Sequence, residues 1–217
     1  MYSYILDKDF LKQMRRVCSG IINQLVQEIN KDSVMTVEAH LVGSGAKHLE
    51  TQNENEPVDL DYNISILETK QFKIQEGRKI KEYIRKKFNA VLNVNGWGDC
   101  QDSTSALTTG RMRFRSNNQT AFSIDVGIVV ERGDGWHRLI HKKTGDHTKD
   151  EYIWNKVRKS EDLTKKVDCL KKNNLWGELR KIYLDKKNLY LSRNDHNHPS
   201  FNIYIESVNE VYFKYFN

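Results

Sequence analysis

Apolar and polar residues in the first half of the chain follow two different periods. Residues 8–29 place apolar side chains three or four positions apart, which predicts an amphipathic helix that packs on a sheet. Residues 57–66 and 121–130 instead alternate with a period of two, which is typical of half-buried strands. These two kinds of pattern predict a core built from both helices and strands.

Further elements follow from the same patterns and from the turn residues between them. Residues 37–42 predict a strand that ends in a Gly-Ser-Gly turn. We also expect a helix over residues 70–88, in spite of Gly77, and strands over residues 90–94, 105–115, 120–130 and 136–140, with a hairpin turn at residues 116–119.

The composition changes after Glu131, and this change divides the chain into two expected parts. Charged helical segments are predicted from about residue 149 to residue 193, and a final helix begins at His198, Pro199 and Ser200. That final helix carries an apolar stripe, which we interpret as core. We therefore expect a first domain over residues 1–145 and a C-terminal helical module over residues 146–217.

Three aspartates carry the candidate chemistry. Asp59 and Asp61 lie two positions apart on one predicted strand and so project from the same face. Asp125 lies in the later run at 121–130 and faces away from its apolar neighbours, so it meets the other two if the strands are adjacent. Carboxylates that crowd together resist joint ionisation and normally need a cation between them, with Mg²⁺ as the default. The alternative interpretation is that these aspartates line a solvated strand face.

The Gly-Ser-Gly turn favours the chemical interpretation of the aspartates. Gly43, Ser44 and Gly45 follow the strand predicted at 37–42, and small residues at such a turn let backbone amides approach a phosphate closely. The order of features is an apolar strand, Gly43 and Ser44, then Asp59 and Asp61 in a strand, then Asp125 in a later strand. This order resembles the DNA polymerase beta-like nucleotidyltransferase superfamily over about residues 35–131.

The resemblance implies an α+β fold, with a mixed, mostly antiparallel sheet flanked by helices and a C-terminal helical module that closes the nucleotide cleft. It implies that Gly43 and Ser44 hold nucleotide phosphates and that Asp59, Asp61 and Asp125 bind two Mg²⁺ or Mn²⁺ ions. The connection over residues 45–58 is longer and more polar than in compact members, which leaves the subfamily open.

The implied reaction is transfer of a nucleoside monophosphate from a nucleoside triphosphate to a hydroxyl acceptor, with pyrophosphate leaving. An acceptor hydroxyl attacks the α-phosphate in line, and Asp125 lies near that hydroxyl as a metal ligand or a weak base. On the far wall of the cleft, charge and position make Lys186, Lys187 and Ser200 the expected triphosphate contacts. Solvated lysines are the alternative for that wall.

The composition of the chain excludes few of the possible binding partners. The net charge of +6, from 35 basic and 29 acidic residues, fits either a polyanionic acceptor or the nucleotide alone. The expected hydroxyl acceptor is a small molecule, a protein side chain, an RNA end or a second nucleotide. The alternative function is a non-catalytic module on the same fold that binds nucleotide or RNA. The sequence shows no membrane-spanning stretch or secretory signal and its three cysteines are widely spaced, so we expect a cytoplasmic enzyme with free thiols.

Overall fold

A computed structural model of the chain describes residues 1–114, 120–157, 162–193, 195 and 200–216. The helices are α1 (Lys8–Lys31), the short 3₁₀ helix η1 (Gly45–Lys47), α2 (Gly77–Val94), α3 (Leu163–Lys172), α4 (Trp176–Ser192) and α5 (Ser200–Phe216). The strands are β1 (Tyr2–Tyr4), β2 (Met35–Leu41), β3 (Thr51–Asn53), β4 (Val58–Thr69), β5 (Gln101–Asp102), β6 (Leu107–Thr108), β7 (Phe122–Arg132), β8 (Gly135–Lys142) and β9 (Glu151–Lys156).

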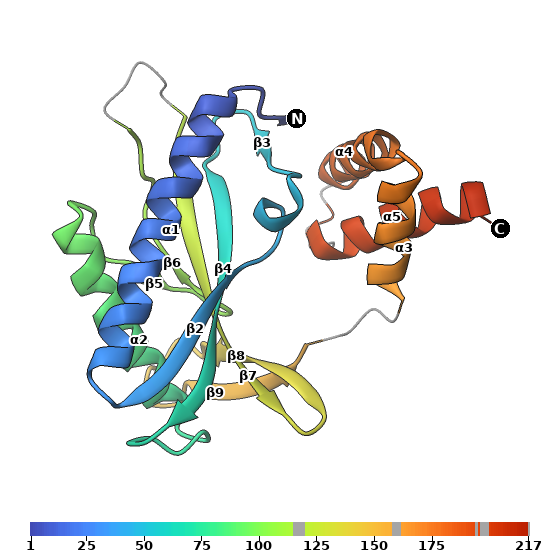
Figure 1. Ribbon diagram of the computed structural model, residues 1–217. Helices are drawn as coiled ribbons and strands as arrows, with labels where there is room; N and C mark the ends of the chain where they lie inside the picture. Colours follow the sequence, from blue (N-terminus) through green and yellow to red (C-terminus); the bar gives the residue numbers. More distant parts are fainter. Residues whose placement is uncertain (115–119, 158–161, 194, 196–199, 217) are drawn as a thin grey trace.

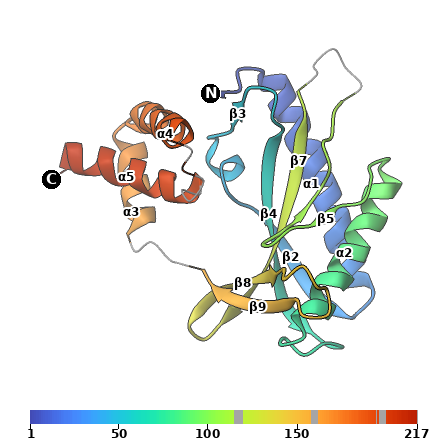
Figure 2. The same ribbon diagram turned by 180° about the vertical axis from the view of Figure 1, so that it is seen from behind.

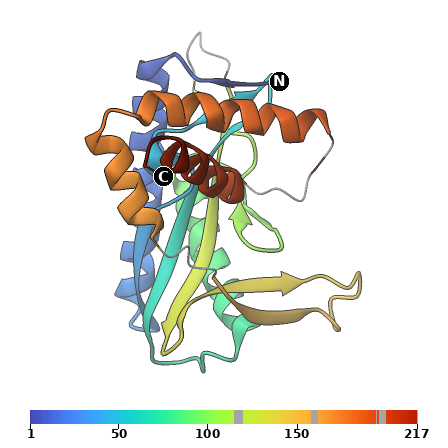
Figure 3. The ribbon, with the colours of Figure 1, turned by 90° about the vertical axis from the view of Figure 1, so that its right-hand side faces the viewer.

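One mixed sheet forms the centre of the fold (Figure 1). Its strands follow the order β2-β4-β7-β6-β5, and β8 pairs with both β7 and β9. Only β4 and β7 run parallel within this sheet, while its other pairs are antiparallel. The α+β class and the mixed, mostly antiparallel sheet expected from the sequence are therefore confirmed. β8 and β9 extend away from the end of the sheet, as the view from the side shows (Figure 3).

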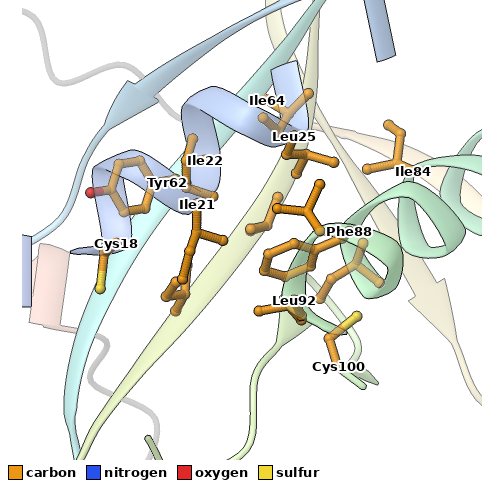
Figure 4. Close-up of a cluster of buried hydrophobic side chains, with 14 of the residues drawn as sticks. Cys18, Ile21, Ile22, Leu25, Tyr62, Ile64, Ile84, Phe88, Leu92 and Cys100 are labelled. Atoms are coloured by element: carbon orange, nitrogen blue, oxygen red, sulfur yellow. The ribbon is translucent and has the colours of Figure 1, made fainter. Parts of the chain in front are cut away.

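The main core lies between the sheet and the helices α1 and α2, which cover one face of it (Figure 2). Both helices place apolar residues at helical spacing, and these side chains meet the apolar face of β4 and β7 (Figure 4). The Asp7 carboxylate caps α1 by accepting a hydrogen bond from the Phe10 amide at 2.8 Å. The predicted helix over residues 8–29 is thus confirmed, with its polar face left outside the core.

A second core forms around the C-terminal helices. Its fully buried members are Leu49, Leu170, Leu179, Tyr183, Ile203, Tyr204, Val208 and Val211. Of these, Leu49 alone comes from outside α3, α4 and α5, so the loop that follows the Gly-Ser turn is anchored in the helical module. β1 and β3 form a separate two-stranded sheet beside α4, a pairing that the sequence pattern did not predict.

Two of the expected strands differ from the structure. Residues 90–94 are the end of α2 and not a strand, because the residues from Ile80 to Leu92 keep one helical stripe facing the core. Of the strand predicted at 105–115, the described residues 105–114 form β6 and an isolated bridge between Met112 and Phe122. The expected hairpin turn at 116–119 lies outside the described residues.

The helical part of the chain begins later than expected. Residues 151–156 form β9, an edge strand paired with β8, instead of the start of the charged helices. The sheet therefore extends past residue 145, and the helical module begins at α3. No helix among the described residues has the length and apolar character needed to cross a membrane.

Candidate active site

Asp59, Asp61 and Asp125 project from two neighbouring strands, as the period of two predicts. Asp61 lies directly opposite Asp125 in the parallel register of β4 and β7, and Asp59 lies opposite Ser123. The Ser123 hydroxyl donates a hydrogen bond to Asp59. On the other face of β4 the apolar residues are buried in the main core. The core thereby fixes the direction in which the three carboxylates point.

The turn after β2 folds back over this acidic centre. The Val42 amide donates to the Asp61 carbonyl at 2.8 Å, which draws the turn onto β4. Gly43 has a φ of +63°, and a Cβ built there would lie 2.1 Å from Asp61 Oδ2. A Cβ on Gly45 would lie 2.7 Å from a methyl group of Leu60. Both glycines are therefore required for the close approach of the turn to the strand.

A cleft of about 800 Å³ opens between the sheet and the C-terminal helices. Of the predicted site residues, Gly43, Ser44, Asp59, Asp61, Lys187 and Ser200 line it. Asp125 is not among the lining residues and lies opposite Asp61 on β7. The structure thus brings together residues that are far apart in the sequence, from β4, β7, α4 and the start of α5.

The two neighbouring lysines of α4 differ in position. Lys187 lines the cleft, and its ammonium group donates to Thr51 Oγ1 at 2.8 Å and lies 4.0 Å from the centre of the Tyr2 ring. Lys186 does not line the cleft, because it points to the neighbouring helix α5, where it forms an ion pair of 3.0 Å with Glu210. Of this pair, only Lys187 lies where a ligand in the cleft would reach it.

The electrostatics of the cleft reflect burial and crowding of like charges. Burial, with the charges of Asp125 and Asp59, raises the pKa of Asp61 to about 6. Burial also raises the pKa of Asp59 and of Asp125. On the opposite wall, burial lowers the pKa of Lys187 to about 8. In the free protein the ionised forms of these aspartates and of Lys187 are therefore unfavourable. Bound cations beside the aspartates and a bound anion beside Lys187 would stabilise them.

The acidic centre suits hard divalent cations. All three side chains offer carboxylate oxygens, the ligands that Mg²⁺ and Mn²⁺ prefer. Within the described residues, Asp125 Oδ1 is buried and has no hydrogen-bond partner. No three His, Cys, Asp or Glu side chains in that part of the chain are already gathered tightly enough to hold an ion. The donor set and the unpartnered oxygen fit a metal that would draw the carboxylates together.

Basic side chains outside the predicted site residues also line the cleft, Lys47 and Arg138 among them. Lys47 follows the Gly-Ser turn in η1, and its ammonium group donates to the Gly43 carbonyl at 3.0 Å. Arg138 lies on β8 and donates to Asn63 Oδ1 at 2.8 Å, next to Asp61 and Asp125. The position of Lys47 three residues after Ser44 was visible in the sequence. That of Arg138 depends on how β8 pairs with β7, which no local pattern reveals.

Comparison with known proteins finds likeness in structure alone. The sequence matches no protein-family model, and no curated protein matches it. Escherichia coli MS115-1 CdnC bound to ATP aligns with 97% of this chain at a TM-score of 0.59 and 15% identity, and the chain covers 67% of CdnC. CdnC in its complex with HORMA-deltaN aligns with 94% at 0.57 and 15% identity, with 60% of that chain covered.

A third similar structure is Vibrio cholerae DncV in its 3′-deoxy ATP bound form. It aligns with 81% of this chain at a TM-score of 0.50 and 14% identity, and the chain covers 45% of DncV. At such identities these alignments show the fold, and that fold is the one expected from the order of the Gly-Ser turn and the three aspartates.

Proposed function

Since the chain has the DNA polymerase beta-like nucleotidyltransferase fold, we propose that it transfers a nucleoside monophosphate from a nucleoside triphosphate to a hydroxyl group and releases pyrophosphate. The observation that carries this proposal is the position of the acidic centre. Asp61 and Asp125 lie opposite each other on parallel strands, directly beneath a turn whose Gly43 leaves no room for a side chain.

The residues of the cleft divide into two groups by charge. Asp59, Asp61 and Asp125 would hold two Mg²⁺ or Mn²⁺ ions, which when bound supply positive charge to the reacting phosphate and make the acceptor hydroxyl more acidic. The turn at Gly43 and Ser44 would hold the phosphate chain through backbone amides and the Ser44 hydroxyl. Asp125, opposite Asp61, would orient the acceptor hydroxyl.

The far wall of the cleft would complete the phosphate site. Lys187 on α4 and Ser200 at the first turn of α5 face the turn across the cleft. Lys187 would offer its charge to the phosphates, and Ser200 offers a hydroxyl at the positive end of a helix. Together the two walls would align the α-phosphate with the acceptor and limit access of water, so positioning is the main contribution of the protein.

A second nucleotide is the acceptor that we propose. The cleft of about 800 Å³ lies near the upper end of the range for small-molecule sites, so it offers room for more than one nucleotide. DncV, to which the chain is similar, is a cyclic AMP-GMP synthase. The proposal for this chain is that the 3′- or 2′-hydroxyl of one nucleotide attacks the α-phosphate of another.

The non-catalytic alternative is less well supported by the cleft. A module that only binds nucleotide has no need for three crowded carboxylates, two of them partly buried, which are costly to keep without a use. The electrostatics therefore support an active enzyme.

Pyrophosphate release from each of the four nucleoside triphosphates, singly and in pairs, tests the proposal. The assay is run with Mg²⁺ or Mn²⁺, with and without total RNA, and with Asp59→Ala as the inactive variant. We expect metal-dependent release that requires Asp59 and is greatest with the correct pair of nucleotides. Stimulation only by RNA would replace the nucleotide acceptor by an RNA end, and absence of release with triphosphate still bound would favour the non-catalytic module.

A further inference from the structure

Lys47 is a cation in the cleft without an anionic partner. No carboxylate in the described part of the chain lies within ion-pair distance of its ammonium group, although the charge of Asp61 acts on it from farther away. Its one hydrogen bond, to the Gly43 carbonyl at 3.0 Å, leaves two of its three N–H donors unused. Burial lowers the pKa of Lys47, which shows that the surroundings do not fully compensate its charge.

The position of Lys47 is held from both sides of the cleft. It belongs to η1, whose neighbour Leu49 is fully buried in the core of the helical module. The Arg180 guanidinium of α4 donates to the His48 carbonyl, and the buried Glu50 is paired with Arg15 of α1. The loop that carries Lys47 is therefore fixed to both parts of the protein, and its backbone presents the lysine to the cleft.

Aromatic rings from α5 lie against the ammonium group of Lys47. The ring centres of Tyr204 and Phe201 lie 5.1 and 5.9 Å from Lys47 Nζ. Ring faces attract a cation but do not accept strong hydrogen bonds, so they orient the group without using its donors. Such a preorganised ammonium group, beside a turn with free backbone amides, suits an oxygen-rich anion.

We propose that Lys47 is a further ligand of the phosphate chain, acting together with Lys187, and that it makes the site selective for nucleoside triphosphates over monophosphates. This inference rests on the proposed function. Lys47 and Lys187 line the same cleft, one beside the Gly-Ser turn and the other on α4. A triphosphate offers a separate phosphate group to each lysine, whereas a monophosphate offers one phosphate group alone.

Calorimetric titration with three probes tests this inference: α,β-methylene ATP, AMP and inorganic tripolyphosphate, each with Mg²⁺. The native chain is compared with Lys47→Met, which keeps the length of the side chain and removes its charge, and with Lys47→Arg. Lys86→Met is the matched control, because Lys86 is exposed on α2 and does not line the cleft. Thermal unfolding of each variant shows whether the fold is kept.

We expect Lys47→Met to bind α,β-methylene ATP and tripolyphosphate about ten- to hundredfold more weakly, the range for a lost charge-assisted hydrogen bond. Affinity for AMP should change less than threefold, and Lys47→Arg should recover most of the loss. Equal losses for AMP and for the triphosphate would show that Lys47 only caps the Gly43 carbonyl and would overturn the inference. Unchanged affinity for the triphosphate would also overturn it. Failure of the native chain to bind any triphosphate would instead contradict the proposed function.

Discussion

Asp61 on β4 and Asp125 on β7 are directly opposite each other in the one parallel strand pair of the described sheet. Parallel neighbours place equivalent residues side by side, so two carboxylates from segments more than sixty residues apart meet beneath the Gly-Ser turn. Every feature of the proposed chemistry depends on this relationship.

Replacement of Gly43 by alanine should disrupt the acidic centre. The added Cβ would lie 2.1 Å from Asp61 Oδ2, and the φ of +63° disfavours any side chain, so the turn or the aspartate must move. We expect activity to fall at least a hundredfold and unfolding free energy to fall by about 1 kcal/mol or more. Gly20→Ala is the control, because a Cβ there meets nothing within 4 Å and alanine favours the interior of α1. Gly20→Ala should keep full activity, and equal activity of the two variants would contradict the role of Gly43.

Replacement of Asp61 by asparagine should remove metal binding without lowering the stability of the metal-free protein. The substitution keeps the volume of the side chain and removes one of three crowded charges, so Tm without metal should stay the same or rise. Addition of Mg²⁺ should raise Tm of the native protein and have little effect on the variant. Glu131→Gln is the control, since Glu131 is an exposed residue of β7. A Mg²⁺-dependent rise in Tm that persists in Asp61→Asn would place the ion elsewhere.

The acidic centre is the part of the site that the sequence revealed most completely. A period of two fixed which residues of β4 face away from the core, and it placed Asp59 and Asp61 together. The meeting of Asp125 with the other two depended on adjacent strands, and the structure shows that β4 and β7 are neighbours. Local patterns alone did not reveal β9, the β1–β3 pair or the true end of α2, because a short amphipathic segment is compatible with both helix and strand until its neighbours are known.

The far wall of the cleft was less predictable. Lys186 and Lys187 are adjacent lysines, so the sequence does not distinguish them. The packing of α4 against α5 and β3 decides which of the two faces the cleft. Ser200 could be expected at a helix start, and it begins α5 at the cleft. Lys47 and Arg138 were not among the predicted site residues, because each gains its role from a distant element, α5 for the first and β4 for the second.

Triphosphate binding should depend on pH through Lys187. Burial lowers its pKa to about 8, so the free protein loses this charge as pH rises through 8. Affinity for α,β-methylene ATP should therefore fall between pH 7 and pH 9, and Lys187→Arg, which stays charged, should remove most of this dependence. The pKa of Lys187 is lower in the folded protein than in the unfolded chain, so the unfolded chain binds more protons between pH 8 and 10.5. Over that range the contribution of Lys187 to the free energy of unfolding therefore rises with pH. Equal pH dependence of the two proteins in the titration would contradict the assignment.

The loop after the Gly-Ser turn should link the stability of the two cores. Leu49 is 1% exposed in the second core, so Leu49→Ala leaves a cavity among α3, α4 and α5. We expect a loss of about 2–5 kcal/mol in unfolding free energy, measured with denaturant, and faster hydrogen exchange in α5. Leu67→Ala is the control, because Leu67 is 58% exposed on β4. A loss as small as that of Leu67→Ala would show that the loop is not anchored in the helical module.

The most direct test of the proposed reaction follows the two ends of the triphosphate. Nucleoside triphosphates carrying label on the α- or the γ-phosphate are incubated with Mg²⁺ and either the native chain or Asp125→Asn, and the products are separated. We predict that the α-label enters a new phosphodiester, that the γ-label leaves in pyrophosphate, and that the variant forms neither product. Formation of the same phosphodiester by Asp125→Asn, or release of the γ-label as inorganic phosphate alone, would contradict nucleotidyl transfer at this acidic centre.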